Sequence, residues 1–244
     1  MKIKKRIKNN ILYLAYFKWR YVRNRPLPGY PTIEEEINFY SQFIDSNSLV
    51  FDIGANHGDK THAYASLGKN VIALEPDRSN NEFLNYRFKL NNKVKIVNKA
   101  VSANEGKAIF FINNPGSGLN TIDAKRQEKM KFKDSYEVQT TTLDILIHEF
   151  GFPDFIKIDV EGHELSVIKG LSKAVNMIAF EANLPDAIDN TIECIDLIYS
   201  LSPKYSFNYG FDVGLESKNW LSKDDISNIV RNSKLSYMNI YCKK

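Results

Sequence analysis

The chain has 244 residues, of which 43% are hydrophobic and 25% charged, and its formal net charge at pH 7 is +4. This composition is typical of one globular domain and excludes a disordered chain, a collagen, a coiled coil and a multi-span membrane protein. Two cysteines, Cys194 and Cys242, are too few for a disulfide framework, so we expect a reduced, cytoplasmic protein.

Positive charge is concentrated at the N-terminus. Residues 1–25 hold nine Lys or Arg and no Asp or Glu, which leaves the other 219 residues with a net charge of −5. The apolar run 11–17 is too short for a membrane span, which needs about 20 residues. We expect residues 1–30 to form a basic, aromatic tail that lies on the inner face of the membrane or packs on the domain or a second subunit. The acidic remainder argues against nucleic acid as a partner.

Short apolar runs alternate with helix-like segments in the rest of the chain. Strands are predicted over 49–53, 71–74, 94–97, 155–159, 177–180, 206–211 and 238–241, and helices over 59–67, 79–90, 163–171 and 187–201. This alternation predicts an α/β domain over 31–244 with a mostly parallel sheet.

Residues 100–154 are long for a single connection between a strand and the next helix. They include two more predicted strands, 108–112 and 137–141, and a turn rich in Gly and Asn between them. We therefore expect an insertion at about 103–145 that lies over the rim of the sheet. Thr142 is expected to cap a helix that follows it.

Acidic residues stand at the ends of four predicted strands, namely Asp52, Glu75, Asp159 and Glu181. In open α/β sheets, ligands bind beyond the carboxyl ends of parallel strands. These four side chains therefore predict a ligand site at one edge of the sheet.

A glycine-bearing turn, Gly54-Ala55-Asn56-His57-Gly58, follows the first predicted strand. Glycine at such a turn lets a ligand approach the backbone closely. The dinucleotide fingerprint would need glycine where Asn56 and Asp59 stand, and Asp52 and Asp59 would repel a pyrophosphate. The turn thus argues against a nicotinamide dinucleotide.

A ligand with positive charge suits this turn better. S-adenosylmethionine carries an ammonium, a sulfonium and one carboxylate. We expect Asp52 to face the ammonium, backbone N–H groups of residues 55–58 to face the carboxylate, and Glu75 to accept both ribose hydroxyls. The alternatives are a turn-capping role for Asp52 and a helix-capping role for Glu75.

A second group of charged residues follows the strand predicted over 155–159. Lys157, Asp159 and Glu161 share one phase of that strand. Unpaired charges are costly near a core, so a functional role is expected, although a Lys157–carboxylate pair that fastens the strand end is the alternative. His163 is the first candidate for a general base because histidine titrates near neutrality, with Glu161 and Asp159 as alternatives.

The residue types bear on two kinds of metal site, one for Mg²⁺ and one for zinc. Asp159, Glu161 and Glu181 offer hard oxygen ligands of the kind that Mg²⁺ binds. No spacing of His and Cys supports zinc. We expect that no metal is needed.

Together these motifs resemble the FkbM-type methyltransferase family. The residues that carry the resemblance are Phe51–Gly58, Ala73–Asp77, Thr142–Asp144, Ile156–Glu164 and Lys169-Gly170, within a span of about 48–185. The resemblance implies a Rossmann-like class I fold with a mostly parallel, doubly wound sheet, an antiparallel C-terminal strand and a small inserted hairpin.

The resemblance also implies S-adenosylmethionine as cofactor and O-methylation of a hydroxyl on a sugar, a glycan intermediate or a related small metabolite. The implied cofactor-binding residues are Asp52, Gly54, Asn56, His57, Gly58, Glu75, Ala100, Val101 and Asp159, with Ala100 and Val101 beside the adenine. The implied catalytic residues are His163, Glu161, Asp159 and Lys157. The alternatives are a methyltransferase for RNA or protein, and a non-catalytic module that binds the cofactor at the membrane surface.

Overall fold

The computed structural model of the chain describes residues 15, 19, 31–67, 70–114, 116–123 and 131–244. The tail predicted over 1–30 and its membrane contact therefore lie outside the described residues, apart from Ala15 and Trp19. None of the helices in the described ranges has the length and apolar character needed to cross a membrane.

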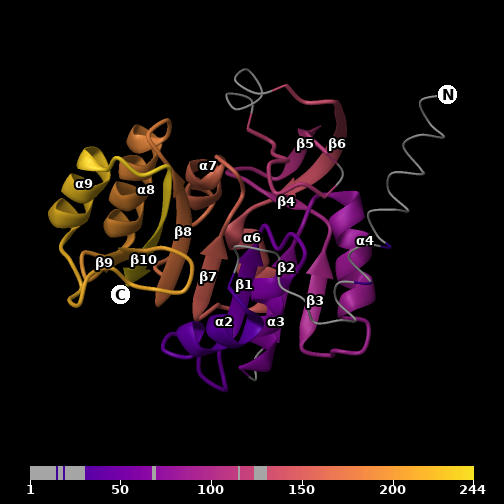
Figure 1. Cartoon of the computed structure of the whole chain (residues 1–244), viewed down its shortest axis with the longest axis horizontal. Helices are drawn as coiled ribbons and strands as arrows, with labels where there is room; N and C mark the ends of the chain where they lie inside the picture. Colours follow the sequence, from indigo (N-terminus) through magenta and orange to yellow (C-terminus); the bar gives the residue numbers. More distant parts are fainter. Residues whose placement is uncertain (1–14, 16–18, 20–30, 68–69, 115, 124–130) are drawn as a thin grey trace.

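A seven-stranded sheet in the order β3-β2-β1-β7-β8-β10-β9 forms the centre of the molecule (Figure 1). The strands are β1 (Leu49–Ile53), β2 (Asn70–Leu74), β3 (Val94–Val97), β7 (Phe155–Ile158), β8 (Met177–Asn183), β9 (Ser206–Gly210) and β10 (Tyr237–Lys243). Every neighbouring pair is parallel except those that β10 makes with β8 and β9. The predicted parallel sheet with an antiparallel C-terminal strand is confirmed.

A second, three-stranded sheet in the order β4-β6-β5 lies apart from the central one, at the top of the view in Figure 1. Its strands are β4 (Ala100–Val101), β5 (Gly106–Ile112) and β6 (Asp134–Thr141). β5 and β6 pair antiparallel from Gly106 with Thr140 to Ile112 with Asp134. This pair is the inserted hairpin that the resemblance implied.

Seven helices are described: α2 (Ile33–Tyr40), α3 (Asp59–Ser66), α4 (Arg78–Arg87), α6 (Leu143–Phe150), α7 (Glu164–Lys169), α8 (Ile188–Leu201) and α9 (Lys223–Asn232). Thr142 caps α6, as predicted, because its side chain accepts a hydrogen bond from the N–H of Ile145. The prediction did not include α2 and α9, although both begin with capping residues, Thr32 and Ser222.

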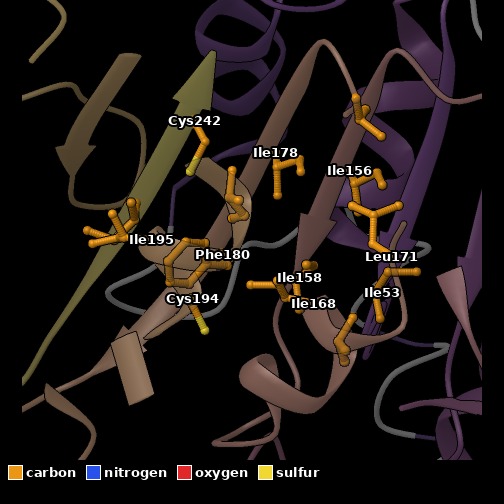
Figure 2. Packing of buried hydrophobic residues seen from close by; sticks show 14 of the residues in the cluster. Ile53, Ile156, Ile158, Ile168, Leu171, Ile178, Phe180, Cys194, Ile195 and Cys242 are labelled. Carbon is orange, nitrogen blue, oxygen red and sulfur yellow. The ribbon is translucent and has the colours of Figure 1, made fainter. Parts of the chain in front are cut away.

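Both faces of the central sheet are buried, which is what a doubly wound sheet requires. Figure 2 shows one face, where Ile53, Ile158 and Phe180 from the strands pack with Ile168 of α7 and Ile195 of α8. On the opposite face, an aromatic cluster holds α2 and α3 against the sheet, with Phe39, Tyr40, Tyr64, Phe155 and Tyr241 among its members. Full burial of one such side chain stabilises the fold by roughly 1.5–3 kcal/mol.

Two charged residues interrupt this apolar interior. Asp52 in β1 and Lys157 in β7 are 1% and 0% exposed. They are register partners across the β1–β7 pair, so both side chains lie on the face that α2 and α3 cover. Because burying charge is costly unless it is paired, these two residues indicate a polar cluster beneath the rim of the sheet.

Candidate active site

A cavity of about 790 Å³ opens along the carboxyl ends of β1, β2, β7 and β8. This volume lies within the roughly 300–1,000 Å³ of small-molecule sites. Its lining includes these predicted residues: Asp52, Gly54, Asn56, His57, Glu75, Ala100, Val101, Asp159 and Glu161. Gly58, Lys157 and His163 are not among the described residues that line it.

The turn between β1 and α3 packs directly against the end of β7. Gly54 has φ +86°, and a Cβ placed there would lie 1.8 Å from the carbonyl oxygen of Asp159. Only glycine fits such an approach at positive φ. Gly58, with φ +77°, instead meets Leu84 and Phe88 of the α4 region, so it serves packing behind the turn.

Glu75 holds this turn from the end of β2. Its Oε2 accepts a hydrogen bond from the N–H of Asn56 at 2.8 Å, and its Oε1 accepts one from the N–H of Asp77 at 2.7 Å. Burial, with a further contribution from Asp77, raises the pKa of Glu75 to about 8. The helix cap proposed as an alternative role belongs to Asp77, whose side chain accepts from the N–H groups of Ser79 and Asn80.

Asp52 lies deeper, at the end of β1. Its Oδ2 accepts a hydrogen bond from Oγ1 of Thr61 at 2.5 Å. Burial raises the pKa of Asp52 to about 6, while the Thr61 hydroxyl and the nearby Lys60 ammonium act in the opposite direction. The carboxyl therefore sits at the base of the cavity, fastened to the first turns of α3.

Asp159, at the end of β7, lies between two ammonium groups. The Nζ atoms of Lys60 and Lys157 are 3.4 Å and 3.7 Å from its Oδ2. Burial alone would raise the pKa of Asp159, but Lys157 and Lys60 hold it below its ordinary value. Lys157 also donates to Oδ1 of Asn239 at 2.9 Å, so it connects β7 to β10 from below the cavity.

His163 does not line the cavity that Asp159 and Glu161 line. Its Nε2 is 3.0 Å from Oγ of Ser102, in a hydrogen bond between α7 and the segment after β4. Burial lowers the pKa of His163, with Asp123 acting in the opposite direction. Glu161, by contrast, lines the cavity and has φ +57°, a conformation that non-glycine residues seldom adopt.

The inserted segment closes one side of the cavity. Asp77 fastens it, because its Oδ2 accepts hydrogen bonds from Nδ2 of Asn120 at 2.8 Å and from the N–H of Gly116 at 3.3 Å. Oγ1 of Thr121 donates to the carbonyl of Glu161 at 3.0 Å. Ser117, Leu119 and Asn120 of this segment all line the cavity.

Three carboxyl groups gather where β7 and β8 end. One oxygen each from Asp159, Glu161 and Glu181 lies within 4.8 Å of the others. The two lysines beside Asp159 already offset its charge, which favours the prediction that no metal is needed there.

Glu36 is one of several cavity residues that the sequence analysis did not identify. Glu36 of α2 is 7% exposed and lines the cavity. The capping box of Thr32 and Glu35 marks the start of α2 in the sequence, but it does not reveal which face of the helix is buried.

Comparison with known proteins supports the motif analysis. A family model described as the methyltransferase FkbM domain matches residues 52–209. The hexuronic acid methyltransferase AglP of Haloferax volcanii is 28% identical over 151 residues, which cover 60% of this chain and 59% of that protein. The match thus spans less than two thirds of that relative's length.

The fold is shared with a solved methyltransferase. The precorrin-6y C5,15-methyltransferase of Geobacter metallireducens superposes with a TM-score of 0.50 and 12% identity, over 91% of this chain and 95% of that chain. At this identity the likeness shows the class I methyltransferase fold alone. The family match, which covers most of the chain, confirms the resemblance found in the motifs and supports methyl transfer with S-adenosylmethionine. The chain belongs to the FkbM methyltransferase family.

Proposed function

We propose that this protein transfers the methyl group of S-adenosylmethionine to a hydroxyl group of a sugar, either free or within a glycan intermediate. The observation that carries the proposal is the row of carboxyl groups in one cavity around a glycine turn: Asp52, Glu75 and Asp159 at the ends of β1, β2 and β7, and Glu181 within the last residues of β8. Membership in the FkbM family supports methyl transfer. The relative named as a hexuronic acid methyltransferase supports a sugar as the acceptor.

The half of the cavity at β1 and β2 suits the methyl donor. Each oxygen of Glu75 accepts one backbone hydrogen bond, and a carboxylate oxygen has a further lone pair, so two ribose hydroxyls have acceptors there. Ala100 and Val101 offer an apolar wall for the adenine. When bound, S-adenosylmethionine supplies a methyl group already activated by its sulfonium, so the protein has to align it and accept a proton.

The other half of the cavity suits a polyhydroxylated acceptor. Beyond β7, β8 and β10 the lining includes Glu161, Glu181, Asn183, Asp212 and Asn239. Carboxylate and amide oxygens accept hydrogen bonds from hydroxyl groups, and amide nitrogens donate to them. A sugar offers many hydroxyls at spacings that such a lining can bind.

We propose Glu161 as the general base for the acceptor hydroxyl. Asp159 is a weaker proton acceptor because Lys157 and Lys60 lower its pKa. Glu161 lines the cavity beside Asp159, and its backbone strain is of the kind that concentrates at functional sites. His163 is directed to Ser102 instead, so we propose that it positions the end of β4.

The test is an assay of methyl transfer from isotope-labelled S-adenosylmethionine to a panel of methyl glycosides of neutral sugars, amino sugars and hexuronic acids, with mass-spectrometric detection. Glu161→Gln should lower kcat by about 10²–10⁴-fold, the usual size of general acid–base catalysis, and leave S-adenosylhomocysteine affinity unchanged. Glu149→Gln, on the exposed side of α6, is the matched control.

Three results would contradict parts of this proposal. A product methylated at nitrogen or carbon would exclude O-methyl transfer. A drop in kcat for His163→Ala with normal turnover in Glu161→Gln would return the base to His163. Loss of activity with a chelator, restored by Mg²⁺, would show that the three carboxyl groups at β7 and β8 bind a metal.

A further inference from the structure

Glu36 of α2 carries a buried carboxyl group that could accept a further hydrogen bond. Its side chain is 7% exposed, and its Oε2 has no hydrogen-bond partner within the described structure. Leaving such an acceptor buried and unpaired is costly, and more so for a charged group. Since Glu36 also lines the cavity, a ligand group that donates hydrogen bonds is the natural partner.

The position of Glu36 in the fold indicates which part of the donor it meets. Glu75, the acceptor for the ribose, follows β2, whereas Asp159 follows β7, on the other side of β1. The charged groups that face Glu36 are Lys60 and Asp59 of α3, Asp52 of β1 and Lys157 of β7. A donor whose ribose lies at Glu75 therefore extends its amino-acid end across β1 toward α2 and β7.

We propose that Glu36 binds the ammonium group of the amino-acid end of S-adenosylmethionine and of its demethylated product. The inference rests on the proposed donor, and it assigns a binding role to a residue outside the segment 52–209 that the family model matches. It also modifies the expectation from the sequence, in which Asp52 faced the ammonium. Asp52 already accepts a hydrogen bond from Thr61, whereas Oε2 of Glu36 has no such partner.

The electrostatic surroundings agree with this assignment. Burial raises the pKa of Glu36 to about 7, even though Lys60 acts to lower it. An ammonium group beside the carboxylate would favour its ionised form and reverse part of this shift. Binding of the amino-acid end should therefore be coupled to release of a proton near neutral pH.

Calorimetry with two ligands separates this role from a structural one. S-adenosylhomocysteine carries the ammonium, and its deaminated analogue keeps the carboxylate, ribose and adenine. Glu36→Gln should weaken S-adenosylhomocysteine binding by about tenfold or more, the usual effect of losing a hydrogen bond between charged groups, and leave the analogue within twofold. Glu34→Gln, exposed on the same helix, should change neither affinity.

A measurement on the wild-type chain covers the case in which Glu36→Gln fails to fold. Carbon-13 NMR of labelled glutamate carboxyl groups should show the pKa of Glu36 falling when S-adenosylhomocysteine saturates the protein, but not with the deaminated analogue. An unchanged pKa, or equal loss of both affinities in Glu36→Gln, would overturn the assignment of Glu36 alone. A wild-type protein that binds neither ligand would overturn the proposed donor itself.

Discussion

Gly54 sets how closely the turn after β1 can approach β7. A methyl group at this position would lie 1.8 Å from the carbonyl oxygen of Asp159, at a φ of +86° that L-residues rarely adopt. Gly54→Ala should therefore displace the turn, with a backbone strain of about 1–3 kcal/mol in addition to the clash. Urea unfolding should show a lower free energy of unfolding, and calorimetry a large loss of S-adenosylhomocysteine affinity.

Gly214→Ala is the control for this substitution. The added methyl group there would meet only the carbonyl oxygen of Phe211, at an ordinary distance of 3.7 Å. Wild-type stability and affinity in both variants would show that the turn does not need the close approach of Gly54 to Asp159.

Glu75 should contribute to affinity through the ribose. Glu75→Ala should weaken S-adenosylhomocysteine binding by about 1–3 kcal/mol, because it removes an acceptor for hydroxyl donors. Free adenine, which has no ribose, provides the ligand control, and Glu82→Gln on the exposed side of α4 provides the protein control. An equal loss for adenine would mean that Glu75 only supports the turn through Asn56 and Asp77.

The residue types in the sequence were enough to predict some residues of this site. The others depend on the direction of their side chains, which the sequence does not show. Asp52, Glu75 and Asp159 were predictable because an acidic residue at the end of a parallel strand has to lie at the ligand edge. His163 was chosen for its titration range, but its direction depends on how α7 packs beside Ser102. Glu36 could not be found because its burial depends on α2 packing against α3 and β1, residues distant in sequence.

At the level of elements, the strands were more predictable than the helices. The inner strands β1, β2, β7 and β8 have apolar runs, since both faces of the sheet are buried there. α2 and α9 begin with clusters of acidic residues, Glu34–Glu36 and Asp224-Asp225, which obscure their apolar side. Their capping residues, Thr32 and Ser222, were the signals available in the sequence. The two-residue β4 has no sequence pattern of its own and depends on pairing with β6.

The inserted segment should act as a cover for the acceptor half of the cavity. Asn120→Ala removes its hydrogen bond to Asp77 and those to the backbone of Asn113 and Asn114, so amide hydrogen exchange over residues 116–122 should become about tenfold faster. The acceptor KM should rise while S-adenosylhomocysteine affinity stays unchanged. Glu105→Gln, exposed in the turn before β5, should leave both constants unaltered. A higher KM in Glu105→Gln alone would contradict this role of Asn120.

Across the whole molecule, several carboxyl groups are buried at or near the cavity. Burial raises the pKa of Asp52 to about 6, of Glu36 and Glu164 to about 7, and of Glu75 to about 8. Between pH 6.5 and 8, Glu36, Glu164 and Glu75 therefore hold protons in the folded protein that the unfolded chain has already released, whereas Asp52 has its effect at lower pH. The stability that these groups contribute is fully present below the pKa values that they have in the unfolded chain. It is lost as the pH rises through the pKa values that they have in the folded protein.

The buried histidines affect the stability of the protein in a different pH range. Burial lowers the pKa of both His62 and His163, so the unfolded chain binds protons at these residues more readily than the folded protein does. Their effect reduces stability only as pH falls below about 6.5, the ordinary histidine pKa. Above that value, Glu36, Glu164 and Glu75 determine the slope of stability against pH.

We therefore expect the ligand-free protein to lose stability as pH rises from 6.5 to 8.5. Urea unfolding at a series of pH values should show a falling free energy of unfolding, and Glu164→Gln should flatten the slope because it removes one of the three groups that titrate in this range. Glu82→Gln should not flatten it. Saturation with S-adenosylhomocysteine should also reduce the slope, since an ammonium at Glu36 favours the ionised carboxylate in the folded state. A stability that rises over this range would mean that these carboxyl groups are ionised in the folded protein, and that the cavity is more hydrated than their burial indicates.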